Sequence, residues 1–160
     1  MTPDEHLKQL RETSEAFRQW FDSELPDIVG VEAVDFFKES FQNEGFTDEA
    51  FEPWPDVKRR TNPTRTDRAA ASRKILTGAT GDLGRSIEYT QAPGEVRITS
   101  DTTSVGSGKD YAAAHNEGTT SAGRNRSVTI PKRQFMGKSK TLDDKIGEIT
   151  EDEAKRILKG

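Results

Sequence analysis

The chain of 160 residues contains no cysteine and only two histidines, His6 and His115. Without cysteine, disulfides, thiolate zinc sites and a cysteine nucleophile are excluded, and two histidines alone cannot form a His-rich metal site. No apolar run approaches the roughly 20 residues of a membrane helix. The polar, acidic start MTPDEHLKQL is unlike a signal peptide. We therefore expect no cofactor, no membrane contact, and folding in the cytoplasm of the producing cell.

The chain also has few apolar residues. Hydrophobic residues make up 31%, and Leu, Ile, Val and Phe together number 30 of 160. This content is close to the level at which chains become disordered, but the net charge of −4 is too small to force disorder. The composition predicts one domain with a small core and extended segments, completed against a partner or a second copy.

Charge is unevenly distributed along the chain. Residues 1–55 contain 4 basic and 14 acidic side chains, residues 56–140 contain 16 and 8, and residues 141–160 contain 4 and 6. Such asymmetry can indicate nucleic-acid binding, or it can reflect attraction between opposed faces within one chain or between copies. We favour the second interpretation, because no basic motif interleaved with aromatic residues accompanies the charge.

Two amphipathic helices are predicted in the first third of the chain. Thr2, Pro3 and Glu5 form a capping box for a helix over residues 3–22. This helix carries an apolar stripe that either packs on the rest of the fold or docks on a neighbouring subunit; it comprises Leu7, Leu10, Ser14, Phe17 and Phe21, with Trp20 beside it. Leu25-Pro26-Asp27 predicts a break, followed by a second helix at 27–44 that ends near Gly45. We therefore predict an N-terminal helical arm over 1–25 and a single domain over 26–160.

The domain is predicted to be α+β. An irregular linker with basic residues covers about 46–74, and a β-hairpin is predicted from residue 83 to 101 around the turn at 92–95. A short helix at 110–116 should pack with the helix at 27–44 against one small antiparallel sheet, built from 83–101 and the extended arms around 119–135. Tyr111 and His115 should anchor the short helix, and Phe135 should be buried. One or two short helices, with a second capping box at Thr150 and Glu153, should end the chain.

The stretch KILTGATGDLGRSI, residues 74–87, resembles the glycine-rich turn of nicotinamide-dependent reductases. That turn binds pyrophosphate only at the N-terminus of a helix that follows a strand. Here an arginine-rich polar segment precedes Lys74, period-two alternation follows Gly84, and the chain is too short for several βαβ units. We therefore interpret the glycines as turns that lead into a strand.

Other candidate chemistry in the sequence is weak. His115 lies four residues after Tyr111 and is predicted to be a packed structural residue. Ser86 and Ser104 have no recognisable base or orienting carboxylate, so a hydrolase triad is unsupported. The basic linker can contact phosphates or an acidic partner; its candidate contact residues are Arg59, Arg60, Arg65, Arg68 and Arg73. We expect no enzymatic activity.

In order along the chain, four segments resemble the phage virion morphogenesis family, the tail completion proteins of Mu-like and related tailed phages. The segments are FFKESFQNEGF with Pro53-Trp54 after it, KILTGATGDLGRSIEY, DYAAAHNEGTT and IPKRQFMGKS, within roughly residues 34–158. The positions that match the family's motifs are Gly81, Leu83, Ser86, Ile87, Tyr111, His115, Gly118, Pro131, Arg133 and Phe135. The doubled turn TGATGDLG and the three alanines after Tyr111 depart from the family's pattern, and the helix at 3–22 is hardly covered.

The resemblance implies a non-enzymatic structural role in a tailed phage, in completing the tail or joining it to the head. It implies work as a tail terminator or neck component, in a homo-oligomeric ring, with other tail or neck proteins as partners and the virion as location. A DNA-contacting protein that uses the basic segment 58–74 is the alternative.

Overall fold

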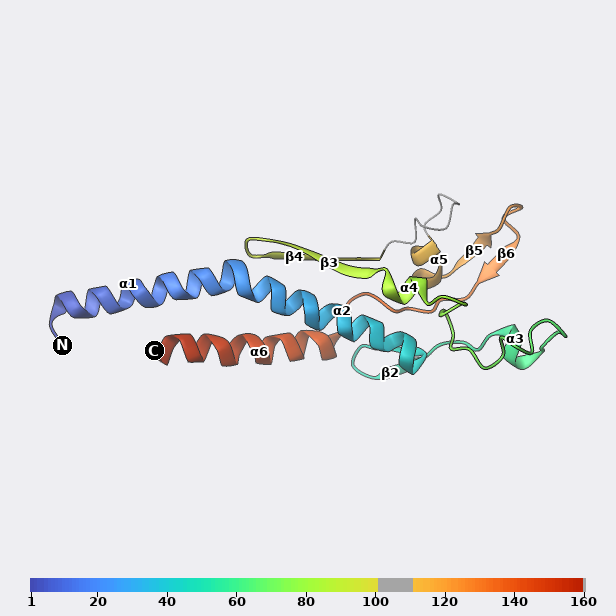
Figure 1. Cartoon of the computed structure of the whole chain (residues 1–160), viewed down its shortest axis with the longest axis horizontal. Coiled ribbons are helices and arrows are strands. Elements are labelled where there is room, and N and C mark those ends of the chain that lie inside the picture. The colour runs from blue at the N-terminus through green and yellow to red at the C-terminus, as the bar shows by residue number, and fades with distance from the viewer. Residues whose placement is uncertain (101–110, 160) are drawn as a thin grey trace.

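A long helical rod forms the spine of the molecule (Figure 1). The computed structural model describes residues 1–100 and 111–159. Helix α1 (Pro3–Gln19) continues through a π-helical turn, η1 (Trp20–Glu24), into helix α2 (Leu25–Asn43). The predicted capping box of α1 is confirmed, since Thr2 Oγ1 accepts a hydrogen bond from the Glu5 amide and the Glu5 carboxylate accepts one from the Thr2 amide.

The helix break predicted at Leu25-Pro26-Asp27 is wrong. Proline lacks an amide proton, and in a regular α-helix its ring collides with the carbonyl four residues earlier. In η1 the Leu25 amide donates to the Trp20 carbonyl, five residues back. This wider turn accommodates the proline, so the rod continues without interruption.

The segment after α2 is more ordered than the predicted linker at 46–74. Helix α2 ends at Asn43 and is followed by Glu44, whose left-handed φ of 54° stops the helix one residue before Gly45, the predicted stop. Strands β1 (Gly45–Thr47) and β2 (Phe51–Pro53) then form an antiparallel hairpin, and α3 (Lys58–Thr61) is a single helical turn. Strands of three residues are too short to show alternation in sequence, which is why this hairpin was not predicted.

The hairpin predicted at 83–101 is confirmed in its main part. Strand β3 (Ile87–Ala92) pairs with β4 (Glu95–Ser100), and Gly94 has a φ of 66° in the two-residue turn. Residues before Ile87 are not extended, however, because Asp82–Arg85 form a one-turn helix, α4. The hairpin therefore begins at Ile87 and not at residue 83.

The last part of the chain contains helix α5 (Tyr111–Glu117), strands β5 (Thr119–Ala122) and β6 (Val128–Ile130), and helix α6 (Lys140–Lys159). Asp110, the predicted start of the short helix, lies outside the described residues. A single helix of 20 residues replaces the one or two short C-terminal helices. Thr150 is not a cap, because it lies inside α6 and its Oγ1 donates to the Ile146 carbonyl.

The α+β class is confirmed, but the single sheet is not. The described strands form three separate antiparallel pairs, β1–β2, β3–β4 and β5–β6. The β3–β4 pair lies along α2, where the Tyr89 ring packs directly on Gly30 and the Tyr89 hydroxyl donates to Asp27 at 2.5 Å. The strands at 119–130 do not pair with this hairpin.

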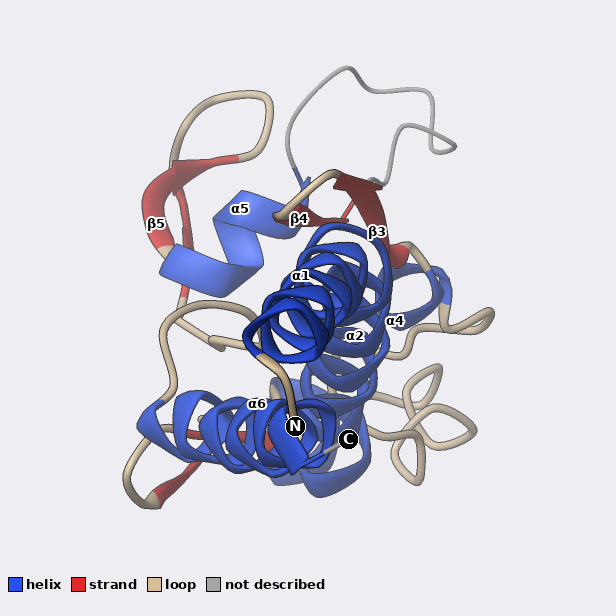
Figure 2. Ribbon diagram, turned by 90° about the vertical axis from the view of Figure 1, so that its left-hand side faces the viewer, coloured by secondary structure: helices blue, strands red, loops and turns tan. Residues whose placement is uncertain are grey.

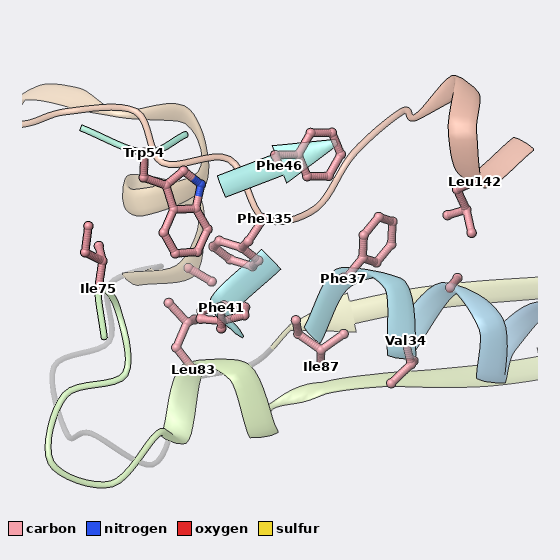
Figure 3. Packing of buried hydrophobic residues seen from close by; sticks show 12 residues of the cluster. Val34, Phe37, Phe41, Phe46, Trp54, Ile75, Leu83, Ile87, Phe135 and Leu142 are labelled. Carbon is pink, nitrogen blue, oxygen red and sulfur yellow. The ribbon is translucent and has the colours of Figure 1, made fainter. Parts of the chain in front are cut away.

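The two views agree that the rod is sandwiched, with β3–β4 on one side and α6 on the other (Figures 1 and 2). Both chain ends lie near one end of the long axis, whereas α3, α5, β5 and β6 lie toward the opposite end (Figure 1). Most of the core sits around the C-terminal half of α2, as Figure 3 shows. Its buried side chains are Ala33, Val34, Phe37, Phe41, Phe46, Trp54, Ile75, Leu83, Ile87, Ala112, Phe135 and Leu142.

Candidate functional site

The glycine-rich stretch forms a tight turn in front of α4. Gly78 and Gly81 have φ values of 55° and 70°, and the Gly81 amide donates to the Thr77 carbonyl at 2.6 Å. The glycines were predicted to lead into a strand, but Gly81 directly precedes α4. That helix has only four residues. The Asp82 carboxylate stands in its first turn and accepts from Thr80 and Arg85, and these bonds lower its pKa.

This geometry positions core residues. Leu83 and Ile87 are 4% and 1% exposed, and Ser86 Oγ donates to the Leu83 carbonyl at 2.7 Å. A negative charge in the first turn of α4 repels a pyrophosphate there. The stretch therefore attaches the β3–β4 hairpin to the core through Leu83 and Ile87.

The segment around Arg133 and Phe135 is held on two sides. On one side, Asn116 Oδ1 accepts hydrogen bonds from the amides of Phe135 and Met136, at 2.9 and 3.0 Å. The Arg133 amide donates to the His115 carbonyl at 2.8 Å. On the other side, the Trp54 indole donates to the Gln134 carbonyl at 2.7 Å.

The Arg133 side chain completes this junction. It is only 6% exposed, and its guanidinium donates to the carbonyls of Pro55 and Asp56 at 2.9 and 3.0 Å. Burial lowers the pKa of this guanidinium, and the positive charge of Arg59 lowers it further. Phe135 is 1% exposed, as predicted, and its ring lies 5.1 Å from that of Phe41.

Two further motif positions adjoin the junction. Gly118 has a φ of 76°, and a Cβ there would lie 2.8 Å from the Lys132 amide nitrogen, close to Pro131 in the chain. His115 is half-buried; burial, followed by the Arg133 charge, lowers its pKa, and its Nδ1 has no hydrogen-bond partner among the described residues. The Tyr111 ring meets the His115 ring edge to face, with centroids 4.4 Å apart, but Tyr111 is 49% exposed, so Ala112 is the residue that α5 buries in the core.

The basic segment 58–74 is partly occupied by its own contacts. Arg60 forms a bidentate pair with Glu44 at 2.6 and 2.9 Å, and Glu44 also accepts from the Ile75 amide at 2.7 Å. These contacts lower the pKa of Glu44 to about 2. Arg59 donates to the carbonyls of Ala70, Arg73 and Lys74. The segment is thus a loop closed onto the end of α2.

Of the predicted contact residues in this loop, Arg65, Arg68 and Arg73 have exposed side chains. Their contact with a partner stays a prediction. Glu44, Asn116 and Ser139 were not among the predicted site residues. Of these three residues, only Ser139 has a recognisable local role, because serine is a common residue directly before the first turn of a helix. Its Oγ accepts a hydrogen bond from the Leu142 amide in the first turn of α6.

An exposed apolar stripe lies on the N-terminal part of the rod. Leu7 and Leu10 are 54% exposed, Phe17 is 37% exposed and Phe21 is 45% exposed, whereas Trp20 is buried. We call Leu7, Leu10, Phe17 and Phe21 the arm stripe. The sequence left two possibilities for this stripe, packing on the rest of the fold or docking on a neighbouring subunit. Among the described residues, most of the stripe does not pack on the rest of the fold.

Sites of other kinds are missing from the described part of the chain. Within residues 1–100 and 111–159, no group of three or more His, Asp or Glu residues is placed to hold a metal ion. None of the helices in these ranges is long and apolar enough to cross a membrane.

Comparisons with known proteins support the resemblance seen in the sequence. No curated protein and no solved structure matches the chain. A family model, the phage virion morphogenesis family, matches residues 22–155, which include all ten motif positions and begin just after α1. Since this match covers most of the sequence, the chain belongs to the phage virion morphogenesis family, and its role is in the structure or assembly of a phage virion.

Proposed function

We propose that the protein is a non-enzymatic component that completes the tail or joins head and tail in a tailed phage, working as a homo-oligomeric ring with tail or neck proteins. Family membership supports a virion role. The observation that carries the structural role is the arm stripe, four large apolar residues that are 37–54% exposed on the helical rod. Exposed apolar faces of this kind mark contact sites in assemblies.

The experiment is to produce phage particles with and without the protein. We expect loss of the protein to leave heads and tails unjoined, or to give tails with abnormal ends. Adding the protein back should restore complete particles. Native mass measurement with the purified tail-tube protein should detect a complex. Normal yields of infectious particles without the protein would refute the proposal.

DNA contact by the segment 58–74 is the second candidate, supported by the exposed guanidiniums of Arg65 and Arg68. Arg59, Arg60 and Lys74 already bond to protein carbonyls or to Glu44. The measurement is DNA binding as a function of salt, because phosphate contacts give a steep dependence. Tight binding at physiological salt, without any association with tail or neck proteins, would favour this candidate.

A further inference from the structure

A groove of about 480 Å³ lies between α5 and the β5–β6 hairpin. Small residues form much of its lining, so large side chains from outside can enter. Its lining includes Tyr111, Ala114, Gly118, Ala122, Gly123 and Ile130. Its volume is within the range of about 300–1,000 Å³ typical of binding pockets. Val128, 52% exposed, extends the apolar surface beside Gly123.

The groove and the arm stripe lie toward opposite ends of the molecule (Figure 1). The continuous helix from residue 3 to 43, at 1.5 Å per residue, is roughly 60 Å long. The arm stripe therefore cannot reach the groove of its own chain. A contact between them has to join two copies.

The charges of the two surfaces are complementary. Residues 1–24 contain six acidic and three basic side chains. The groove lining itself contains one acidic residue, Glu117, but the adjoining residues 118–142 contain six basic and no acidic side chains. Arg124 and Arg126 follow Gly123 in the turn of the β5–β6 hairpin and are exposed. Two acidic arms would repel one another, so charge favours the arm on the groove over the arm on a second arm.

We propose that the arm of one copy docks its stripe into the α5/β5–β6 groove of the next copy, with Arg124 and Arg126 facing the acidic flank of α1. The stripe spacing, Leu7, Leu10, Phe17 and Phe21, is that of a helix laid in a groove. The contact is head-to-tail, so each copy offers one arm and one groove, and repetition generates a ring if the rotation closes. This inference rests on the proposed function, for which it names the subunit contact.

The arm is tested with two variants of equal charge on neighbouring residues. Leu10→Asp places a carboxylate in the stripe, and Gln9→Asp places one outside it. In native mass and sedimentation measurements at several concentrations, the wild type and Gln9→Asp should assemble alike. Leu10→Asp should weaken self-association about tenfold or more, as expected for the loss of an interface anchor. Circular dichroism should show that both variants remain folded.

The groove is tested with the double variant Arg124→Glu with Arg126→Glu, matched by Arg65→Glu with Arg68→Glu in the exposed part of the loop 58–74. The first should weaken self-association and the second should not. Mixing Leu10→Asp with the groove variant then gives the sharpest result. One intact arm and one intact groove remain, so we expect a 1:1 complex of twice the 17.8 kDa chain mass and no larger species.

Several outcomes would overturn the inference. A monomeric wild type at all concentrations, or equal assembly of Leu10→Asp and wild type, excludes the arm as the subunit contact. Absence of a 1:1 complex on mixing indicates an arm-to-arm contact instead. A third outcome is a monomeric wild type together with a Leu10→Asp variant that is not incorporated into particles. This outcome excludes the arm of a second copy as the occupant of the groove and indicates that the arm binds another virion protein. If particles still require the protein in these cases, its proposed role in completing the tail or joining head and tail stands, whereas a monomeric wild type contradicts the proposed ring.

Discussion

Replacement of Phe135 by alanine measures how much stability the motif junction contributes. The side chain is 1% exposed, packs on Phe41, and lies in the segment that Asn116 holds by two amide hydrogen bonds. A buried aromatic residue removes about 150–250 Å² from water, which at about 25 cal/mol per Å² corresponds to about 4–6 kcal/mol as an upper bound. Measured Phe→Ala replacements in cores cost about 3–5 kcal/mol, and we expect a loss in that range.

Urea unfolding at one fixed protein concentration is the assay, because self-association would make the midpoint depend on concentration. The matched control is Phe51→Ala, since Phe51 is 49% exposed at the start of β2. The control should lose about 1 kcal/mol or less. A loss below about 1 kcal/mol for Phe135→Ala, or losses of equal size in the two variants, would refute the placement of Phe135 in the core.

Three other predictions concern single contacts. Asn116→Ala should cost about 1–3 kcal/mol in urea unfolding, because two amides lose their acceptor, while Asn116→Asp should retain most of the stability; equal losses would contradict this. The pKa of Glu44 is lowered to about 2 from 4.5 by its pair with Arg60, so its contribution of about 2 kcal/mol is present above pH 4.5 and is lost as the pH falls toward 2. Glu44→Gln should flatten the acid limb of the stability curve, and an unchanged limb would exclude this carboxylate as its cause. Gly118→Ala should lower the free energy of unfolding by about 2 kcal/mol or more, because its φ is 76° and the added Cβ would meet the Lys132 backbone. The control is Gly147→Ala, which lies in open space on α6 and should be stabilising by about 0.5–1 kcal/mol. Thermal melts that rank the two variants in the opposite order would contradict the backbone argument.

Local features of the fold were predictable because their causes lie within a few residues. Thr2, Pro3 and Glu5 start α1 as the capping pattern requires. The period-two alternation around the Pro93-Gly94 turn marks β3 and β4. The break at Pro26 was mispredicted, since a π turn that accommodates proline depends on how the chain winds over five residues and leaves no compositional trace.

The candidate site was predictable in part. The motif positions near Arg133 and Phe135 lie in one junction, but the side chains that hydrogen-bond to this segment were not predicted. Asn116 bonds to residues 19 and 20 positions away, and the Trp54 indole bonds to a carbonyl 80 positions away. A side chain that accepts two backbone amides looks in sequence like any other surface asparagine.

By itself, the sequence determined the chemistry of the surfaces: an acidic amphipathic arm, a basic and acid-free segment at 118–142, and no cysteine. These properties follow from residue type and from the helical period alone. Only the tertiary structure decided that the three hairpins stay separate, that Arg59 and Arg60 bond within the chain, and that the arm and the groove lie at opposite ends. The physical reason is that such outcomes depend on contacts between residues far apart in the sequence, such as Tyr89 on Gly30 and Arg60 with Glu44.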